Sequence, residues 1–157
     1  RQEVGGAAAL AYALGVALTD VGRLDEARQN LERAREVWVQ AHGPEHRDVG
    51  RVNAALARVE RRARRFAQAL KLWQTALDIA ERTRGPGHLE VARVLTEIGV
   101  TRIDSGQVSQ ETVAKLERAL SIWRQHDPAD VDQAALGRTL FALARALDSQ
   151  PGAGERA

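Results

Sequence analysis

The arginines between residues 47 and 65 are the side chains in this sequence best suited to bind a charged ligand. Seven arginines and only two acids, Asp48 and Glu60, give this stretch a net charge of +5 in a chain whose net charge is +2. Guanidinium groups bind carboxylates and phosphates through paired hydrogen bonds. The stretch therefore predicts a surface for acidic groups. The alternative is a solvated helix face that neighbouring acids partly neutralise, in a chain whose basic residues are almost all arginine.

The four histidines are the residues best suited to bind a transition metal. They are His42, His46, His88 and His126, and all lie in or beside the segments that contain proline. Gly43-Pro44 separates the first two, so they are not expected to share a helical face. His46 and His88 are 42 residues apart, which would place them about 10 Å apart across packed helices. We therefore expect these histidines to cap or pack at turns, with no metal site.

Motifs for catalysis are missing from the sequence. It contains no nucleophile elbow, no Gly-rich phosphate loop and no His-Glu-x-x-His pattern. Cysteine is absent as well, so there is no thiolate chemistry. We predict that this chain is not an enzyme, has no catalytic residues and needs no cofactor.

A repeat of 42 residues organises the chain. Gly43-Pro44 recurs as Gly85-Pro86, and Asp127-Pro128 follows at the same spacing. A fixed period in this range is typical of solenoids, whose units bury their apolar faces against their neighbours. The expected units cover residues 5–43, 44–85 and 86–127, with a partial fourth at 128–150, in a single solenoid over 1–157.

Apolar residues at helical spacing within each unit predict two helices per repeat. The expected helices span residues 5–20, 25–41, 47–63, 67–83, 90–104, 110–125 and 131–149. No segment alternates with the period of a strand. The fold class is therefore all-α: three helical hairpins and one extra C-terminal helix. The three tryptophans (Trp38, Trp73 and Trp123) are expected to pack in the interior.

The repeat resembles the tetratricopeptide repeat (TPR). Leu14-Gly15, Leu56-Ala57 and Ile98-Gly99 match the signature of its first helix, and Gly22 and Gly106 match the turn. The second helices match through the list Ala27, Leu31, Ala34, Ala69, Trp73, Ala76, Leu116 and Ala119. The 42-residue length and the linkers at 43–49 and 85–91 are similar to the kinesin-light-chain-like subclass, as found in bacterial multidomain regulators.

This resemblance implies a right-handed α-solenoid that binds a protein or peptide in a concave groove lined by the first helices. Projected onto this sequence, the groove yields one set of partner-binding residues: Tyr12, Arg51, Arg58, Arg61, Arg62, Arg93, Arg138, Phe141 and Arg145. The arginines favour an acidic partner. A nucleic-acid-binding solenoid is the alternative, but the small net charge and the scarcity of aromatic residues weigh against it.

The last helix suggests a second mode of interaction. Leu136, Leu140, Leu143 and Leu147 form an apolar stripe flanked by Phe141. Exposed apolar stripes of this kind tend to find partners, so self-association through this helix is the second alternative. No apolar run reaches the ~18 residues of a membrane span. We expect the sensor or scaffold part of a larger cytoplasmic protein, because the chain begins without Met and its repeats predict a binding scaffold.

Overall fold

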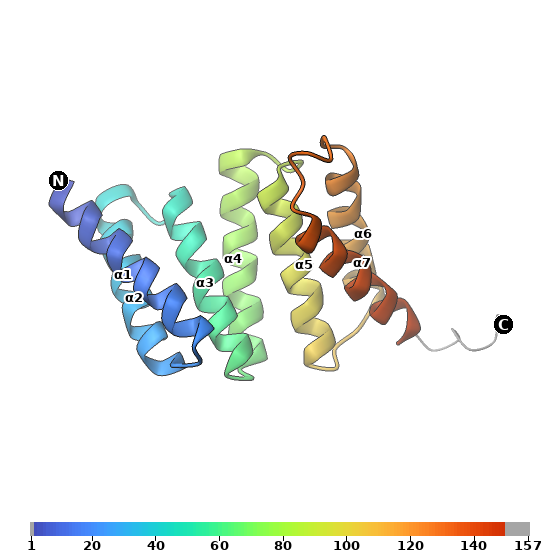
Figure 1. Cartoon of the computed structure of the whole chain (residues 1–157), viewed down its shortest axis with the longest axis horizontal. Helices are drawn as coiled ribbons and strands as arrows, with labels where there is room; N and C mark the ends of the chain where they lie inside the picture. Colours follow the sequence, from blue (N-terminus) through green and yellow to red (C-terminus); the bar gives the residue numbers. More distant parts are fainter. Residues whose placement is uncertain (1, 150–157) are drawn as a thin grey trace. The chain divides into compact units, whose positions relative to one another are not determined.

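The computed structural model describes the backbone of residues 2–149 and the side chains of residues 6–149. In that part of the chain it contains seven α-helices and no strand (Figure 1). The helices are α1 (Gln2–Asp20), α2 (Leu24–His42), α3 (Arg47–Arg62), α4 (Phe66–Arg84), α5 (Leu89–Asp104), α6 (Gln110–Arg124) and α7 (Gln133–Asp148). The predicted number and order of helices are confirmed, and their ends lie within three residues of the expected ones.

The chain divides after Thr83 into two compact units. In the first unit, α1 and α2 form an antiparallel hairpin, and α3 packs on both of them (Figure 1). In the second unit, α5 and α6 form the equivalent hairpin, and α7 packs on both. Each unit therefore contains the same motif, a helical hairpin followed by the first helix of the next repeat, and the first unit also contains α4 up to Thr83.

The turn inside each hairpin depends on one residue whose backbone φ is positive, in the left-handed region of the Ramachandran plot. Gly22 has a φ of 83° and Gly106 a φ of 72°, and both end the first helix of a hairpin. Glycine adopts this conformation without the steric cost that a Cβ imposes. The second hairpin has Arg64 at this place, with a φ of 59°. The backbone therefore keeps the same turn although the side chain disfavours it.

Two of the four histidines, His46 and His88, are helix caps, as expected. His46 precedes α3, and its Nδ1 accepts the backbone N–H of Asp48 at 3.3 Å. His88 precedes α5 and accepts the N–H of Glu90 at 3.1 Å in the same way. Each imidazole thereby satisfies one of the N–H groups that the first turn of a helix leaves unpaired.

The core of the hairpins consists of small residues that pack beside leucines. Ala27, Leu31 and Ala34 of α2 are fully buried in the first unit. Leu116 and Ala119 of α6 are fully buried in the second. All three tryptophans are buried, which confirms the expectation that they pack in the interior.

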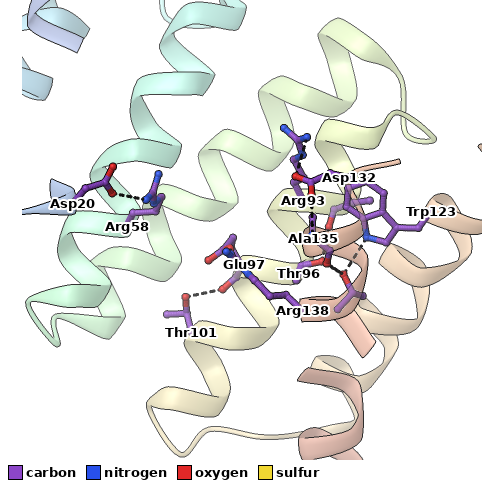
Figure 2. A network of polar contacts seen from close by, with 12 residues as sticks. Asp20, Arg58, Arg93, Thr96, Glu97, Thr101, Trp123, Asp132, Ala135 and Arg138 are labelled. Atoms are coloured by element: carbon purple, nitrogen blue, oxygen red, sulfur yellow. Dashed lines mark hydrogen bonds and ion pairs between the residues drawn. The ribbon is translucent and has the colours of Figure 1, made fainter. Parts of the chain in front are cut away.

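A buried polar contact holds α7 against the hairpin of the second unit (Figure 2). The hydroxyl of Thr139 on α7 lies 2.7 Å from that of Thr96 on α5. It also accepts the indole N–H of Trp123 on α6 at 3.0 Å. A single α7 hydroxyl therefore meets both helices of the preceding hairpin.

Candidate partner-binding surface

The solvent face of α3 consists of arginines. Every exposed residue in Arg47–Arg62 is an arginine, namely Arg47, Arg51, Arg58 and Arg62. Steps of four and seven residues place the last three on one side of a helix. The remaining sides of the helix carry buried residues, among them Val52, Leu56 and Val59. Burial of the apolar side thus forces the arginines outward into one row.

The first arginine of this row lies on an aromatic pair. The guanidinium carbon of Arg51 is 5.2 Å from the centroid of the Tyr12 ring. That ring in turn lies 5.6 Å from the ring of Trp38. A cation over an aromatic face is attracted by the quadrupole of the ring. Arg51 also lies 3.5 Å from Asp48 on its own helix, so its position is set from two sides.

The other two arginines reach the C-terminal end of α1. Arg58 forms an ion pair with Asp20 at 3.2 Å (Figure 2). Arg62 donates to the backbone carbonyl of Thr19 and, at 3.5 Å, to that of Asp20. Cations are favourable at the end of a helix, where carbonyl groups lack partners. Asp20 and Arg58 keep 61% and 44% of their side chains exposed, so solvent or a ligand can still reach both.

Arg61 differs from the row that it was predicted to join. It is half-buried, whereas Arg58 and Arg62 are exposed. One helical residue is a turn of 100°, so adjacent arginines cannot share the same outward side. Tyr12 is half-buried as well, and the guanidinium of Arg51 lies over its ring.

In the second unit, the predicted residues bridge α5 and α7 (Figure 2). Arg93 on α5 forms an ion pair with Asp132 at 3.4 Å. Arg138 on α7 pairs with Glu97, a largely buried carboxylate of α5. These arginines have carboxylate partners within the unit, which the sequence did not indicate.

Phe141 and Arg145 lie further along α7 and are both exposed. The guanidinium carbon of Arg145 is 5.9 Å from the centroid of the Phe141 ring. The structure therefore brings these two predicted residues together, as it does Tyr12 with Arg51.

The two histidines beside the first linker stack on each other. The rings of His42 and His46 stack, with centroids 4.5 Å apart and an angle of 29° between their planes. Gly43, with a φ of 88°, lies between them, and both rings line an open surface depression of about 440 Å³ with Pro44. His42 is the last residue of α2 and His46 caps α3, so the two do not share a helical face, as expected, although their rings are in contact. Among the described residues, no three metal-ligating side chains come together.

This arrangement of paired helices joined by Gly-Pro linkers defines an α-solenoid of helical hairpins. The family model for the tetratricopeptide repeat matches residues 6–69 and 50–110. The chain belongs to the tetratricopeptide repeat family, and the resemblance to its kinesin-light-chain-like members is confirmed. No curated protein matches the sequence.

Solved structures share the fold. BtubC (BKLC) from P. vanneervenii superposes with a TM-score of 0.83 at 24% identity, over 90% of this chain and 56% of that one. This chain thus spans a little over half of the length of BtubC. Two structures of a Podosopora anserina putative kinesin light chain with nearly identical TPR-like repeats have TM-scores of 0.73 and 0.72. Both are 23% identical, over 95% of this chain and 68% of theirs.

Membership in this family carries a general function. Tetratricopeptide repeats mediate protein–protein interactions, and folds of this type are typically non-catalytic. No described helix of this chain has the length and apolarity needed to cross a membrane.

Proposed function

We propose that this chain is a non-catalytic module that binds an acidic segment of a partner protein along α1 and α3. The observation that carries the proposal is the row of Arg51, Arg58 and Arg62, the solvent face of α3. The row begins at Arg51, whose guanidinium lies over the half-buried ring of Tyr12. In a larger cytoplasmic regulator, such a module serves as a sensor or scaffold.

The partner's carboxylates exchange with a carboxylate that the protein already supplies. Asp20 already forms an ion pair with Arg58. Both side chains are exposed enough for a carboxylate of the partner to compete for Arg58. Exposed ion pairs contribute only about 0–1 kcal/mol, so exchanging one carboxylate for another is inexpensive. Binding then gains from several arginines at once, and we expect micromolar dissociation constants, which correspond to about −8 kcal/mol.

Arg93, Arg138, Phe141 and Arg145 of the second unit belong to the same proposed set. Arg93 and Arg138 remain exposed while paired with acids. They can therefore take part in the same exchange of carboxylates as Arg58. Phe141 provides the second unit with an exposed aromatic ring, as Tyr12 provides the first with a half-buried one.

A titration with a labelled hexaglutamate peptide tests the proposal, with hexaglutamine as the neutral control. Arg58→Glu/Arg62→Glu should weaken hexaglutamate binding at least about tenfold, since two attractive charges become repulsive. Arg33→Glu/Arg124→Glu changes the net charge equally at exposed positions on α2 and α6. This control should retain most of the affinity. Equal affinities of the two double variants would reject the site.

Asp20→Asn supplies the converse test. It removes the carboxylate that competes for Arg58 while it preserves the shape of the side chain. The variant should bind hexaglutamate several-fold more tightly than the wild type. If its affinity is unchanged, Arg58 only links α1 to α3 and does not contact the ligand.

Self-association through α7 is a second candidate function. Leu140, Phe141 and Leu147 of this helix are exposed by 45%, 66% and 46%. The predicted single stripe of leucines is divided, because Leu136 and Leu143 are half-buried. Apolar side chains gathered on one surface favour association in water. Sedimentation velocity over a range of protein concentrations tests this function: the mean mass should rise with concentration.

A further inference from the structure

The turn that joins α3 to α4 carries a second group of exposed arginines. Arg62, Arg64 and Arg65 are all exposed there. At the place of Arg62, the other two hairpins have the acids Asp20 and Asp104, 42 residues away in each direction. The hairpin of α3 and α4 is thus the one whose first helix ends in a positive charge. We call residues 62–66 the basic turn.

Arg64 holds a backbone conformation that favours glycine. Its φ is 59°, and glycine occupies this turn in the other two hairpins. A side chain in the left-handed region carries a steric cost, and such strain is often found at functional positions. The side chain is exposed, so the core does not require it. What this strained residue adds to the protein is therefore its guanidinium group.

The guanidinium of Arg64 lies over an aromatic ring and has no acid beside it. Its carbon is 5.6 Å from the centroid of the Phe66 ring. Within the described residues, this ring is the only partner of the guanidinium. A guanidinium stacked on a ring keeps its planar edge of N–H donors available, and that edge matches the two oxygens of a carboxylate. Arg64 can therefore accept an acidic group from outside.

The two acidic residues beside the basic turn are already paired. Glu60 is buried between two arginines, each of which donates to it at 2.6 Å. Asp20 pairs with Arg58 at 3.2 Å. A carboxylate that binds Arg58 has to replace Asp20, and the exchange of one exposed pair for another yields little. A carboxylate that binds Arg64 displaces no acid, so this contact should gain more.

We propose that Arg64 is a further residue of the partner-binding surface, and that the acidic segment of the partner continues past α3 onto the basic turn. The inference rests on the proposed function and extends it to a residue that was not among those predicted from the sequence. Because α3 ends at Arg62, this arginine both closes the row along the helix and begins the turn.

The length of the row sets the length of the segment. From Arg51 to Arg62 the row is about 16 Å long, at about 1.5 Å per helical residue. An extended segment of about 3.3 Å per residue covers that distance with about five residues. Contact with the basic turn therefore requires a longer acidic run. Labelled decaglutamate is long enough to contact both the row and the turn, and decaglutamine is its neutral control.

Arg64→Gly gives the sharpest test. It should weaken decaglutamate binding at least about threefold, through the loss of one charge-assisted contact. The same variant should melt at a higher temperature than the wild type, because glycine relieves the strain. A loss of affinity in a more stable protein cannot come from misfolding.

Three further variants separate charge, backbone and geometry. Arg64→Ala keeps the strained backbone and removes the same charge, so it should weaken binding as much as Arg64→Gly. Arg64→Lys keeps the charge without the planar fork and should bind with intermediate affinity. Arg33→Gln removes one exposed charge from α2 and should leave the affinity nearly unchanged.

Other outcomes overturn the inference in distinguishable ways. If Arg64→Gly and Arg64→Ala bind like the wild type while Arg58→Glu/Arg62→Glu binds weakly, the segment ends with the row. The proposed function then stands, and Arg64 is no part of it. If Arg33→Gln loses as much affinity as Arg64→Gly, only net charge matters and the basic turn is rejected. A wild type that does not bind decaglutamate rejects the proposed function together with this inference.

A single-stranded oligothymidylate of ten nucleotides tests the class of partner. Its phosphates also match guanidinium groups, but the chain has few aromatic rings on which bases could stack. At equal salt concentration, the oligonucleotide should therefore bind more weakly than decaglutamate. Tighter binding of the oligonucleotide, again weakened by Arg64→Gly, would assign the basic turn to a nucleic acid and reject the acidic protein segment.

Discussion

Gly99 lies directly against Leu116 across the hairpin of the second unit. A Cβ placed on Gly99 would stand 2.5 Å from Cδ2 of Leu116, closer than van der Waals contact allows. Gly15 and Leu31 have the same relationship in the first hairpin, at 2.6 Å. The recurring glycine thus sets how closely the two helices of a hairpin approach.

Replacing this glycine should therefore destabilise the protein. We expect Gly99→Ala to cost about 1–3 kcal/mol, the usual range for overpacking a well-filled core. Gly137→Ala is the matched control on α7, because nothing lies within 4 Å of a Cβ placed there. That change should stabilise by about 0.5–1 kcal/mol through helix propensity. Urea denaturation measures both, and equal effects would contradict the close approach.

The sequence predicted the helices because two independent signals agree. The apolar period marks each helix, and glycine or proline marks most of the turns and linkers between them. The small residue after Leu14, Leu56 and Ile98 could also be identified. Its partner across the hairpin follows from the repeat, which places Leu31, Trp73 and Leu116 at corresponding positions. The local apolar pattern and the register of the repeat were therefore sufficient to predict the helices and the contact inside each hairpin.

Contacts between first helices could not be predicted in this way. Arg58 and Asp20 are 38 residues apart, and their pairing depends on how α3 rotates on α1. The division of the leucines on α7 has the same origin, since spacing alone does not fix which side of the helix is covered. The stack of His42 on His46 depends on the φ of Gly43, which no periodicity reveals.

Arg64 should be replaceable by glycine with a gain in stability. Its φ of 59° is unfavourable for a residue with a Cβ, and glycine occupies this turn in the other two hairpins. Arg64→Gly should stabilise by about 0.5–1 kcal/mol, after the loss of a weak contact between its guanidinium and Phe66. Arg64→Ala loses that contact but keeps the strain, so it should show no gain. Thermal melting compares the three proteins, and equal melting temperatures for Gly and Ala would contradict the strain.

Glu60 should be the most sensitive carboxylate of the first unit. It is buried on α3 between Arg28 and Arg65, each of which donates to it at 2.6 Å. Burial lowers the pKa of Arg28, but Glu60 and Asp25 outweigh this effect and raise it.

Glu60→Ala leaves the half-buried Arg28 without this carboxylate. It should cost about 3–5 kcal/mol, the range for breaking a buried ion pair. Arg82→Ala breaks the exposed pair with Glu45 and should cost less than about 1 kcal/mol. Denaturant titration of both variants gives the comparison, and a loss for Glu60→Ala as small as that of the control would show that Arg28 finds another partner.

Thr139 should determine how firmly α7 is held in the second unit. Thr139→Val keeps the shape of the side chain but removes the acceptor of the buried Trp123 N–H. A buried donor without a partner costs about 1–3 kcal/mol. We therefore expect faster amide exchange across α7 than in α5 and α6, measured by hydrogen–deuterium exchange. Thr75→Val, at an exposed threonine of α4, is the matched control and should leave exchange in α7 unchanged.

A double variant separates the hydrogen bond from simple packing. Trp123→Phe removes the donor, so combining it with Thr139→Val leaves no buried N–H unsatisfied at this place. The two changes together should cost less than the sum of their separate effects, by about 0.5–3 kcal/mol, the range for directly coupled residues. Strict additivity would mean that the 3.0 Å contact between Trp123 and Thr139 contributes nothing. In that case, apolar contacts alone would hold α7, and the exposure of its outer face would be independent of this threonine.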